Sequence, residues 1–541
     1  MRKYIFIVGG VMSGVGKGVA AASIGKIIQS RGFEVTAIKI DPYINVDAGT
    51  MNPTEHGEVF VLDDGMECDQ DMGNYERFLD RDLSGANYMT TGSVYQAVIE
   101  RERGLGYAGK CVEVVPHIPL EVLNRIDKAA TKNKADFVIV EIGGTVGEYQ
   151  NILFLEAIRM LKIKKPQDVL LCLVSYLPLQ SEGELKTKPT QYAVRTLNSA
   201  GLQPDIIIAR AKVPLDKKRK EKIAFNCNIN ESDVISAPNI ESIYEVPVNF
   251  EKDKISELIL NKLKLKPRSR DMRRWQKLVK NIHFSKKPVK IGIVGKYFSA
   301  GEFILADSYI SVIEAVKQAS YFFNKKPIIS WLNAEAYEKT SSRLSELDEY
   351  HGIIVPGGFG SRGTEGKISV IRYCRENKIP IFGLCYGMQL AVIEFARSVG
   401  KMKKANTTEV NSETPYPVID ILPEQKKNLS EQNYGGTMRL GAYPAIIKKG
   451  TIAYQAYKQH LISERHRHRY EVNPQYIERL EKKGLIFSGF SPDKRLMEIL
   501  ELPREKHPFF VATQFHPEFK SRPLNPHPLF MEFIKATIKY K

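Results

Sequence analysis

The feature that most constrains the fold is a repeated alternation of continuous apolar runs with helical patterns. Runs such as "FEVTAIKI", "ADFVIVEIGG", "DVLLCLVSYLP" and "PDIIIARA" are separated by segments such as "ILFLEAIRMLKI", whose apolar residues recur at helical spacing. Strands that are apolar on both faces are typical of a parallel sheet covered by helices on both sides. The sequence therefore predicts an α/β fold built on doubly wound, mostly parallel sheets.

This pattern starts twice along the chain. Residues 2–10 ("RKYIFIVGG") and 288–297 ("PVKIGIVGKY") are both apolar strands that run into glycine, and a helical pattern follows each. The segment between the two halves is charged, has prolines at both ends and few apolar positions, and 541 residues suggest more than one core. We predict a first domain at 1–266, a linker at 267–288 and a second domain at 289–541.

The composition restricts the compartment and the partners. The net charge is +17, but lysine and arginine are spread along the chain rather than gathered in one stripe or tail. This spread favours a lysine-rich solvated surface and anionic small-molecule substrates over nucleic acid. The six cysteines form no C-x-x-C pair, no signal-peptide pattern is visible, and no apolar stretch approaches the roughly 20 residues that span a bilayer. We expect a cytoplasmic protein without nucleic-acid or membrane partners.

The first glycine-rich turn, "IVGGVMSGVGKG", lies between an apolar strand and a helical pattern, as a phosphate-binding loop does. Its backbone N–H groups would cradle phosphates, and Lys17 would reach the outer ones. A plain tight turn is the alternative. Gly18 stands where such loops carry the Ser or Thr that binds magnesium, so the metal ligands should be carboxylates elsewhere. Glu141 at the end of the run "FVIVE" and Asp71 in "MECDQDMGNYERF" are the candidates.

The second domain contains a candidate nucleophile in "GLCYG", which follows the strand "IPIF" and opens the helix "MQLAVIEFA". This is a nucleophile-elbow pattern with Cys385 in place of serine, and the helix N-terminus would supply N–H groups for an oxyanion. A cysteine nucleophile needs an oriented base. His516 and Glu518 are two residues apart and would face the same side of an extended segment. His466 and His468 in "SERHRHRYEVN" are competing candidates for the base.

Several long motifs in the first half resemble the synthetase domain of the CTP synthase family almost end to end. They are "GGVMSGVGKG", "KIDPYINVDAGTMNPTEHGEVFVLDDG", "DMGNYERF", "VEIGGTVGE" and "GELKTKPTQ". The resemblance implies a P-loop fold similar to that of dethiobiotin synthetase, with ATP as a substrate and Mg2+ held by Asp71 and Glu141. The ATP contacts that it implies are Gly14, Val15, Gly16, Lys17, Gly18, Val19 and Asp71, with Pro238, Asn239 and Ile240 beside the adenine ring.

The same resemblance implies a site for UTP and for CTP as a feedback inhibitor. Lysines beside Thr and Gln suit a triphosphate, since they combine charge with neutral hydrogen bonds. The implied contacts are Ser13, Lys186, Thr187, Lys188, Pro189, Thr190, Gln191 and Lys222, with Glu148, Tyr149 and Gln150 at the inhibitor's sugar. This last stretch is less acidic than the family pattern. Lys39 is expected to stabilise charge during phosphoryl transfer, and His56 to line an ammonia channel.

Cys385, the His-Pro-Glu segment and "PGGFGSRG" resemble the class I glutamine amidotransferase domain, which is flavodoxin-like. The resemblance implies that Cys385 attacks the side-chain amide of glutamine, that His516 transfers the proton and that Glu518 orients His516. Backbone N–H groups near Gly358 and Tyr386 would form the oxyanion site. The implied glutamine contacts are Gly358, Tyr386, Gly387, Met388, Gln389, Glu409 and Arg469.

Together, the two resemblances imply that ATP phosphorylates O4 of UTP and that ammonia from glutamine displaces the phosphate to give CTP. They also imply activation by GTP, inhibition by CTP and a homotetramer. Two other functions fit parts of the sequence. Another ATP-dependent glutamine amidoligase would amidate a carboxylate, and a partitioning-type ATPase would use the first domain as a switch. The second alternative would leave Cys385, His516 and Glu518 without a role.

Overall fold

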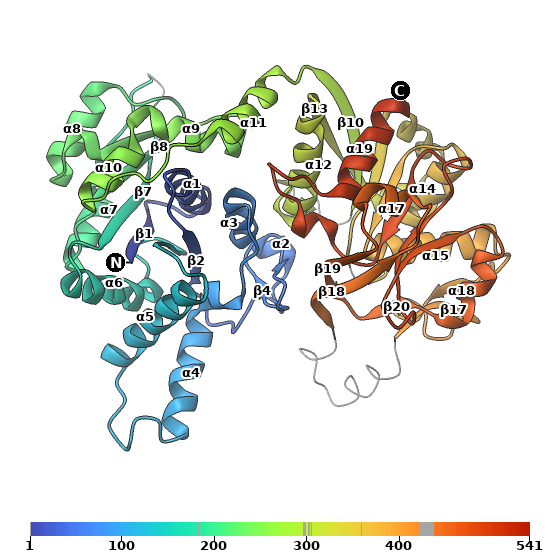
Figure 1. Cartoon of the computed structure of the whole chain (residues 1–541), viewed down its shortest axis with the longest axis horizontal. Helices are drawn as coiled ribbons and strands as arrows, with labels where there is room; N and C mark the ends of the chain where they lie inside the picture. Colours follow the sequence, from blue (N-terminus) through green and yellow to red (C-terminus); the bar gives the residue numbers. More distant parts are fainter. Residues whose placement is uncertain are drawn as a thin grey trace. The chain divides into compact units, whose positions relative to one another are not determined.

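The computed structural model describes residues 2–180, 183–295, 299–300, 303–304, 306–358, 360–421 and 438–540. The chain folds into two compact units (Figure 1). One unit consists of Met1–Thr50 and Asp71–Val279, and the other of Met51–Gln70 and Lys280–Lys541. In the described part of the chain, no helix combines the length and the apolar character that crossing a membrane requires.

The first unit is built on a seven-stranded sheet in which every strand pair is parallel, as the continuous apolar runs predict. The order is β5-β2-β6-β1-β7-β8-β9, so the strand that leads into the glycine-rich turn lies at the centre. In the register, Ile7 of β1 is paired with Glu141 of β6. The strands are β1 (Lys3–Gly10), β2 (Val35–Asp41), β5 (Tyr88–Thr90), β6 (Phe137–Ile142), β7 (Val169–Leu177), β8 (Ile206–Ala211) and β9 (Val234–Pro238).

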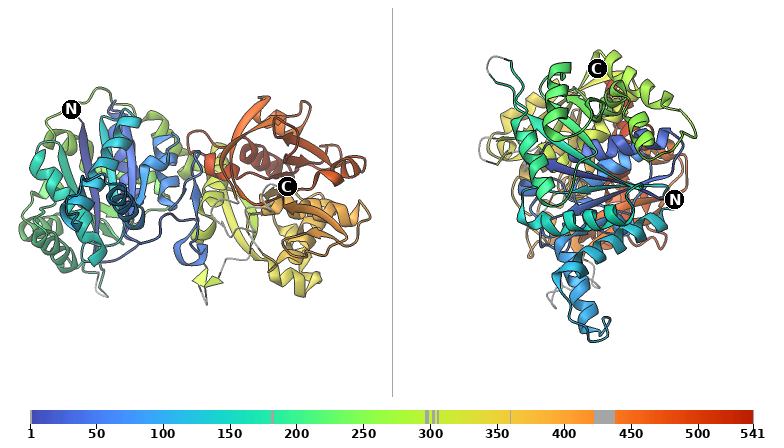
Figure 2. Two further views of the ribbon diagram at one scale, coloured as in Figure 1. Left: turned by 90° about the horizontal axis from the view of Figure 1, so that it is seen from below. Right: turned by 90° about the vertical axis from the view of Figure 1, so that its left-hand side faces the viewer.

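Helices cover both faces of this sheet, which explains why its strands are apolar on both sides. Tyr4, Phe6 and Val8 belong to a core cluster with residues of α5, α6 and α7, while α1 is buried along most of its length and packs against α3. Helix α4 extends away from the sheet (Figure 2). The helices are α1 (Lys17–Ser30), α3 (Asp71–Leu79), α4 (Thr91–Arg103), α5 (Val114–Lys132), α6 (Ile152–Lys164), α7 (Lys188–Ser199), α8 (Lys217–Cys227), α9 (Val246–Phe250), α10 (Ile255–Lys262) and the part of α11 (Arg273–Phe284) that ends at Val279.

Helix α11 lies inside the segment predicted to be a linker. Its apolar residues Trp275, Leu278, Val279 and Ile282 follow helical spacing, and all four are buried. Trp275 is only 1% exposed; its Nε1 donates to the carbonyl oxygen of Tyr244 at 2.8 Å. The many charges of this segment mask its amphipathic pattern in the sequence. Because its apolar residues are buried, the segment contributes to packing as well as to the connection.

The second unit is built on a nine-stranded sheet with the order β13-β10-β14-β15-β23-β22-β21-β18-β19. Strands β13 to β23 in this order are parallel, and the remaining four continue the sheet as antiparallel neighbours. Over the two sheets taken together most strand pairs are parallel, so the predicted α/β class with mostly parallel sheets is confirmed. The strands are β10 (Lys287–Gly295), β13 (Lys325–Asn333), β14 (Gly352–Val355), β15 (Ile381–Leu384), β18 (Arg439–Ile447), β19 (Leu461–His468), β21 (Ile486–Phe490), β22 (Met497–Glu501) and β23 (Phe510–Thr513).

Two core clusters lie on the two faces of this second sheet. One contains side chains of α12 and α19, and the other contains side chains of α14 and α15. A small sheet of β16 (Ala405–Thr407), β17 (Tyr416–Ile421) and β20 (Tyr470–Val472) adjoins the second cluster. The helices are α12 (Ile310–Phe322), α13 (Ala334–Lys339), α14 (Thr364–Glu376), α15 (Tyr386–Ser398), α17 (Ile452–Tyr457), α18 (Pro474–Glu481) and α19 (Pro528–Tyr540).

Met51–Gln70 belongs to the second unit, although the sequence places it inside the first domain. It contains α2 (Pro53–His56) and the antiparallel pair β3 (Phe60–Val61) and β4 (Glu67–Cys68). Phe60 is fully buried, and its ring packs edge-on against Phe519 with 5.0 Å between centroids. The segment thus packs against the rest of the second unit through a buried aromatic contact.

Candidate active sites

The glycine-rich turn joins the end of β1 to the start of α1. Gly14 and Gly16 have φ values of +72° and +87°, a region that glycine enters at no steric cost. Gly16 is the N-cap of α1 and provides no side-chain cap, so the first N–H groups of the helix can bind an anion. Val15 is buried within the turn, and Val19 is half-buried in the first turn of α1. This geometry is that of a phosphate-binding loop.

Lys17 folds back over this turn. Its Nζ donates to the carbonyl oxygen of Gly144 at 2.7 Å, and the side chain is mostly buried. A Cβ at Gly9 would lie 2.9 Å from Nζ, so the absence of a side chain at Gly9 makes room for the lysine. Burial lowers the pKa of Lys17, and the nearby carboxylate of Glu141 opposes that effect.

The space beside Gly18 is occupied by the carboxylate of Asp71. A Cβ built on Gly18 would lie 1.9 Å from Oδ1 of Asp71, a distance that no side chain can accept. Asp71 is the first residue of α3. The position that carries a serine or threonine hydroxyl in other phosphate-binding loops therefore holds a carboxylate that arrives from elsewhere in the chain.

Asp71 and Glu141 share one ammonium group. Nζ of Lys39 lies 2.6 Å from Oδ2 of Asp71 and 2.9 Å from Oε1 of Glu141, and the hydroxyl of Tyr75 donates to the other oxygen of Glu141. Burial and the charge of Asp71 raise the pKa of Glu141. Burial would also raise the pKa of Asp71, but the Lys39 ammonium brings it below its usual value. Asp41 lies close by, 3.8 Å from the same ammonium.

These carboxylates fit a magnesium ion that also takes phosphate ligands. The described residues contain no group of three or more His, Cys, Asp or Glu arranged to hold a metal by themselves. Magnesium in nucleotide sites is commonly held by one or two carboxylates together with phosphate oxygens and water. Asp71 and Glu141 supply two carboxylates, and Asp71 fills the notch at Gly18 next to the loop.

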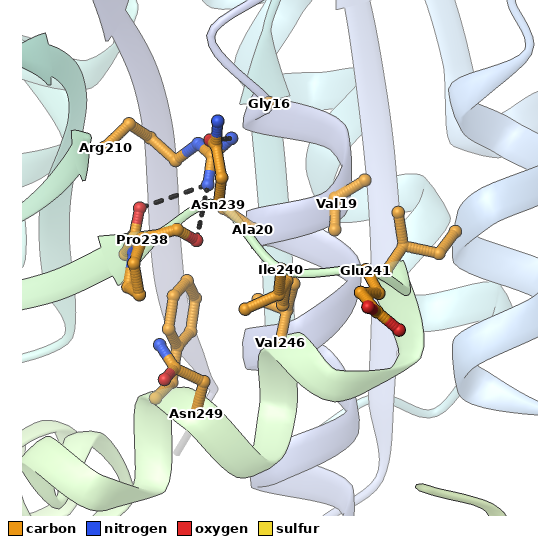
Figure 3. A pocket seen from close by; sticks show the side chains of 13 residues that line it. Gly16, Val19, Ala20, Arg210, Pro238, Asn239, Ile240, Glu241, Val246 and Asn249 are labelled. Carbon is orange, nitrogen blue, oxygen red and sulfur yellow. Dashed lines mark hydrogen bonds between the residues drawn. The ribbon is translucent and has the colours of Figure 1, made fainter. Parts of the chain in front are cut away.

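A pocket of about 280 Å³ opens beside the loop (Figure 3). Gly16 and Val19 from the turn and α1 line it together with Pro238, Asn239 and Ile240, so the structure brings these predicted ATP contacts together. The other lining residues are Ala20, Arg210, Ala237, Glu241, Ile243, Val246, Asn249 and Phe250.

Arg210 is a lining residue that the sequence reasoning missed. Its guanidinium donates to the carbonyl oxygen of Pro238 at 3.1 Å and to Oδ1 of Asn239 at 3.2 Å. These bonds hold the segment that follows β9, as the dashed lines in Figure 3 show. The available signal was one arginine near the end of the apolar run "PDIIIARA". Tyr75, which bonds Glu141, was likewise missed inside the motif "DMGNYERF".

The predicted UTP lysines Lys186 and Lys222 lie near one carboxylate. Nζ of Lys186 is 2.5 Å from Oε2 of Glu184, and this hydrogen bond, with a further contribution from the charge of Lys222, lowers the pKa of Glu184. Lys188 is exposed and Pro189 half-buried in the first turn of α7. The lysines thus form a basic surface beside the N-terminus of that helix.

The neutral residues of the same motif are bonded inside the unit. Oγ1 of Thr190 is 2.8 Å from Oγ of Ser175, and Nε2 of Gln191 donates to Oγ1 of Thr187 at 3.1 Å. Thr187, Thr190 and Gln191 are all buried. In this structure they fix the turn before α7.

Ser13 and the stretch Glu148–Gln150 lie at other points of the first unit. Ser13 is exposed in the turn, and Tyr149 is 90% exposed. One carboxylate oxygen of Glu148 accepts from the backbone N–H of Thr145 at 2.7 Å, and the other accepts from Nε2 of Gln150 at 2.8 Å. Gln150 therefore donates a hydrogen bond to Glu148, whereas an acidic residue at position 150 would repel the Glu148 carboxylate.

Cys385 is the N-cap of α15 and has a φ of +52°. Its backbone N–H donates to the carbonyl oxygen of Thr513 at 2.7 Å, and Sγ lies 3.8 Å both from the carbonyl oxygen of Arg467 and from Nε2 of Gln514. A Cβ at Gly387 would lie 2.1 Å from the carbonyl oxygen of Val355, so the tight turn requires glycine there. A strained residue on a strand–turn–helix is the geometry of a nucleophile elbow.

His516 and Glu518 form a bonded pair next to this cysteine. Nδ1 of His516 is 2.7 Å from Oε1 of Glu518, and the imidazole stacks on Phe519 at 5.0 Å. A Cβ at Gly357 would lie 3.1 Å from Cε1 of His516 and 3.7 Å from Cβ of Cys385, which places both side chains around that glycine. Burial would lower the pKa of His516, but Glu518 and Cys385 raise it to about 10.

The two competing histidines belong to a buried cluster. Nδ1 of His466 is 2.9 Å from Nε2 of His468, and Nε2 of His466 is 3.5 Å from Oε2 of Glu498. Burial lowers the pKa of both histidines well below the usual value, so both stay neutral. Of the alternatives that the sequence leaves open, the geometry favours His516 as the base.

The predicted glutamine contacts gather near this turn. Oε1 of Glu409 accepts from the N–H of Gly360 at 2.7 Å. Burial raises the pKa of Tyr470, with Glu409 raising it further and Arg469 lowering it, which places both charged groups beside Tyr470. A carboxylate and a guanidinium together suit the two charged ends of an amino acid.

The remaining predicted contacts lie on the same elements. Gly358 has a φ of +152°, and Phe359 of the same motif is outside the described residues. Nε2 of Gln389 donates to the carbonyl oxygen of Tyr470 at 3.0 Å, and Tyr386 and Met388 are buried in α15. His56, the predicted channel residue, is exposed at the end of α2 in the second unit.

Family models match both halves of the chain. Residues 3–265 match the model described as CTP synthase N-terminus, and residues 304–536 match the model described as glutamine amidotransferase class-I. Among solved structures, the glutaminase domain of Trypanosoma brucei CTPS with bound acivicin is 36% identical. It covers 46% of this chain and 94% of its own, with a TM-score of 0.43.

Curated relatives match the chain from end to end. The CTP synthases of Pyrococcus abyssi and Pyrococcus furiosus are each 52% identical over 544 aligned residues, which cover 100% of this chain and 99% of the relative. The CTP synthase of Caldanaerobacter subterraneus is 51% identical with the same coverage. With both family models matched and half of all residues identical over the whole length, the chain belongs to the CTP synthase family.

Proposed function

We propose that this protein converts UTP to CTP, with ATP as the phosphoryl donor and glutamine as the nitrogen source. The observation that carries the proposal is the presence of two complete side-chain sets on one chain. The first unit holds a phosphate-binding loop with Lys17, Asp71 and Glu141, and the second holds Cys385 with a bonded His516–Glu518 pair. The relatives named CTP synthase, matched over the full length, support the choice of reaction.

Cys385, His516 and Glu518 would carry out the glutaminase reaction. The thiol proton of Cys385 passes to His516, whose raised pKa favours holding it. The sulfur then attacks the side-chain amide carbon, and His516 gives the proton to the departing ammonia. The 2.7 Å bond to Glu518 holds the imidazole in the orientation that this transfer needs. Water then hydrolyses the glutamyl thioester, with His516 again accepting the proton, and releases glutamate and free Cys385.

The first unit would carry out the phosphoryl transfer and the amination. The N–H groups of the loop and Lys17 bind the ATP phosphates, and Lys39 balances charge beside the two carboxylates. Asp71 and Glu141 would hold Mg2+, which supplies charge compensation to the phosphates when bound. The γ-phosphate passes to O4 of UTP, and ammonia displaces that phosphate at the 4-carbon, which gives CTP and inorganic phosphate.

The substrate contacts and the regulation belong to the same proposal. Lys186 and Lys222 would bind the UTP triphosphate, while Glu148 and Gln150 would bind the sugar of CTP as a feedback inhibitor. Activation by GTP and assembly as a homotetramer follow from the family resemblance. A reducing cytoplasmic location is supported by the cysteines, which are all free.

The test is to incubate the purified protein with UTP, ATP, Mg2+ and amide-15N-labelled glutamine and to analyse the nucleotides by chromatography and mass spectrometry. We expect CTP that carries the label. The absence of CTP, with GTP present as well, would contradict the proposal. Glutamine and ATP consumption that depends on a carboxylic acid acceptor instead of UTP would identify another amidoligase.

A further inference from the structure

Three carboxylates attach the segment Met51–Gln70 to the rest of the second unit. Glu58 accepts from the backbone N–H of Ser311 at 3.2 Å and from its hydroxyl, at the start of α12. Oδ1 of Asp63 is 2.5 Å from Nε of Arg465. Further along the segment, Glu67 forms an ion pair with Arg467. The segment is therefore held by directional, charged contacts as well as by the buried ring of Phe60.

The two arginines alternate along β19 with the two buried histidines. Arg465 and Arg467 direct their side chains to the segment, where Oε1 of Glu67 lies 2.7 Å from Nε of Arg467. His466 and His468 point to the opposite face of the strand, as the two-residue period of a strand requires. Both arginine side chains are largely buried, with that of Arg465 fully so.

The backbone of the same two arginines contacts the candidate catalytic residues. The carbonyl oxygen of Arg465 accepts from the backbone N–H of His516 at 2.8 Å. The carbonyl oxygen of Arg467 lies 3.8 Å from Sγ of Cys385. Each arginine thus contacts the segment through its side chain. Through its main-chain carbonyl group, Arg465 contacts His516 and Arg467 contacts Cys385.

An aromatic contact runs in parallel with these ion pairs. Phe519 packs edge-on against Phe60 of the segment at 5.0 Å, and it stacks on the imidazole of His516 at 5.0 Å with 17° between the planes. Lys520, the next residue, adds a 3.3 Å contact to Asp63. The segment therefore supports His516 from the ring side as well as from the main chain.

We propose that Asp63 and Glu67 are positioning residues for glutamine hydrolysis, acting through Arg465 and Arg467 on the geometry of Cys385 and His516. The inference rests on the proposed glutaminase activity and extends it, because these two acids lie within the part of the chain that matches the CTP synthase N-terminus model. Removing one partner of a buried charge pair leaves the other charge uncompensated. The arginine then moves, and its carbonyl group moves with it.

The test compares full-length variants in two assays, glutamine hydrolysis and CTP formation from free ammonia. We expect Glu67→Gln and Asp63→Asn each to lower kcat for glutamine hydrolysis about tenfold, because small misplacements of reacting groups have large effects on rate. The KM for glutamine should stay within about twofold, since the predicted amino-acid contacts Glu409 and Arg469 are untouched. The ammonia-dependent rate should stay unchanged.

Two further variants make the test specific. The charge-reversed pair Glu67→Arg with Arg467→Glu should recover most of the lost kcat, because it restores the ion pair and leaves the carbonyl group in place. Glu55→Gln, an exposed acid on the same segment, is the matched control and should leave both assays unchanged. Cys385 should also react more slowly with iodoacetamide in Glu67→Gln and recover in the charge-reversed pair.

Normal kcat values in both single variants would overturn the inference. Equal losses in the two assays, or a loss that the charge-reversed pair does not recover, would also overturn it, since either result assigns the effect to something other than this ion pair. If the unmodified protein does not hydrolyse glutamine at all, the proposed function itself fails, and the two failures are thereby distinguished.

Discussion

The two candidate sites are built on the same local geometry and use it in opposite ways. In each, a parallel strand leads into a turn whose last residue, the helix N-cap, has a positive φ: +87° at Gly16 and +52° at Cys385. In each, the second residue of the helix is a glycine. At Gly18 the space that a Cβ would fill holds the carboxylate of Asp71, whereas at Gly387 it holds the carbonyl oxygen of Val355.

This difference shows how one supersecondary unit can serve two kinds of chemistry. The first turn offers backbone N–H groups and takes its charged groups from other elements, so it suits a ligand that brings its own anionic charge. The second turn would carry the reacting atom itself, in a strained conformation, and would take only the base from another element. Changes at the second turn should therefore affect a covalent step, and changes at the first should affect phosphate binding and transfer.

The largest effect is expected at Glu518, which orients His516, the candidate proton acceptor of the second site. Glu518→Gln removes the charge that orients His516, and we expect glutamine hydrolysis to fall by about 10⁴-fold, as in related triads. The pKa of His516, raised to about 10 with Glu518 present, should fall in the variant. Histidine NMR titration measures this directly: the imidazole should stay protonated to a higher pH in the unmodified protein. An unchanged titration would contradict the proposed pair.

The next largest effect is expected for Lys17→Ala, at the first turn. Because Lys17 would reach the outer phosphates, its removal should lower CTP formation by about 10²- to 10³-fold with either glutamine or ammonia as nitrogen source. Basal glutamine hydrolysis should stay within about twofold. A variant that loses only the glutamine-dependent reaction would show that the lysine serves the second site.

The substitution Gly18→Ala tests whether the Asp71 carboxylate beside Gly18 has a role in CTP formation. The new methyl group would displace Asp71, and we expect CTP formation to fall by about 10²-fold, since a displacement of about 1 Å can cost that much. Gly147→Ala is the control, because a Cβ there meets no atom within 4 Å. Added Mg2+ should restore part of the lost rate in Gly18→Ala, and equal activity of the two variants would contradict the assignment of Asp71.

The smallest functional effect is expected at Trp275, which lies against Lys26 of α1, with Nζ 5.3 Å from its ring. Trp275→Ala should lower the free energy of unfolding of the first unit by about 3 kcal/mol or more. Hydrogen exchange should speed up in α1 and α3 and stay unchanged in α15. Faster exchange in α15 would show that the packing of Trp275 stabilises the second turn as well as the first.

Much of the fold and part of the sites can be predicted from local sequence patterns. Continuous apolar runs predict parallel strands, and strand–glycine–helix patterns locate both turns, because these signals lie within a few residues of one another. The contact of Asp71 with Gly18 is different. Its partners are far apart in sequence, and spacing alone makes Asp71 only one acid among several. The resemblance to a family, and not a periodicity, singled it out.

The elements that the sequence reasoning missed depend on tertiary packing. Trp275 lies in a charged segment whose amphipathic pattern becomes clear only when its buried face has a partner. The segment Met51–Gln70 belongs to the second unit, although the residues on either side of it belong to the first. It is held there by ion pairs such as Asp63 with Arg465, about 400 residues away. The antiparallel part of the second sheet contains strands such as β18, whose burial alternates instead of being continuous. Such long-range pairings leave weak local signals.

The proposed function requires two separable sites, one that makes ammonia and one that consumes it. The most direct measurement is CTP formation by Cys385→Ala with glutamine and, in parallel, with ammonium chloride at raised pH. We predict that the glutamine-dependent rate is lost while the ammonia-dependent rate equals that of the unmodified protein. Loss of both rates, or CTP formation that still uses glutamine nitrogen, would contradict the account.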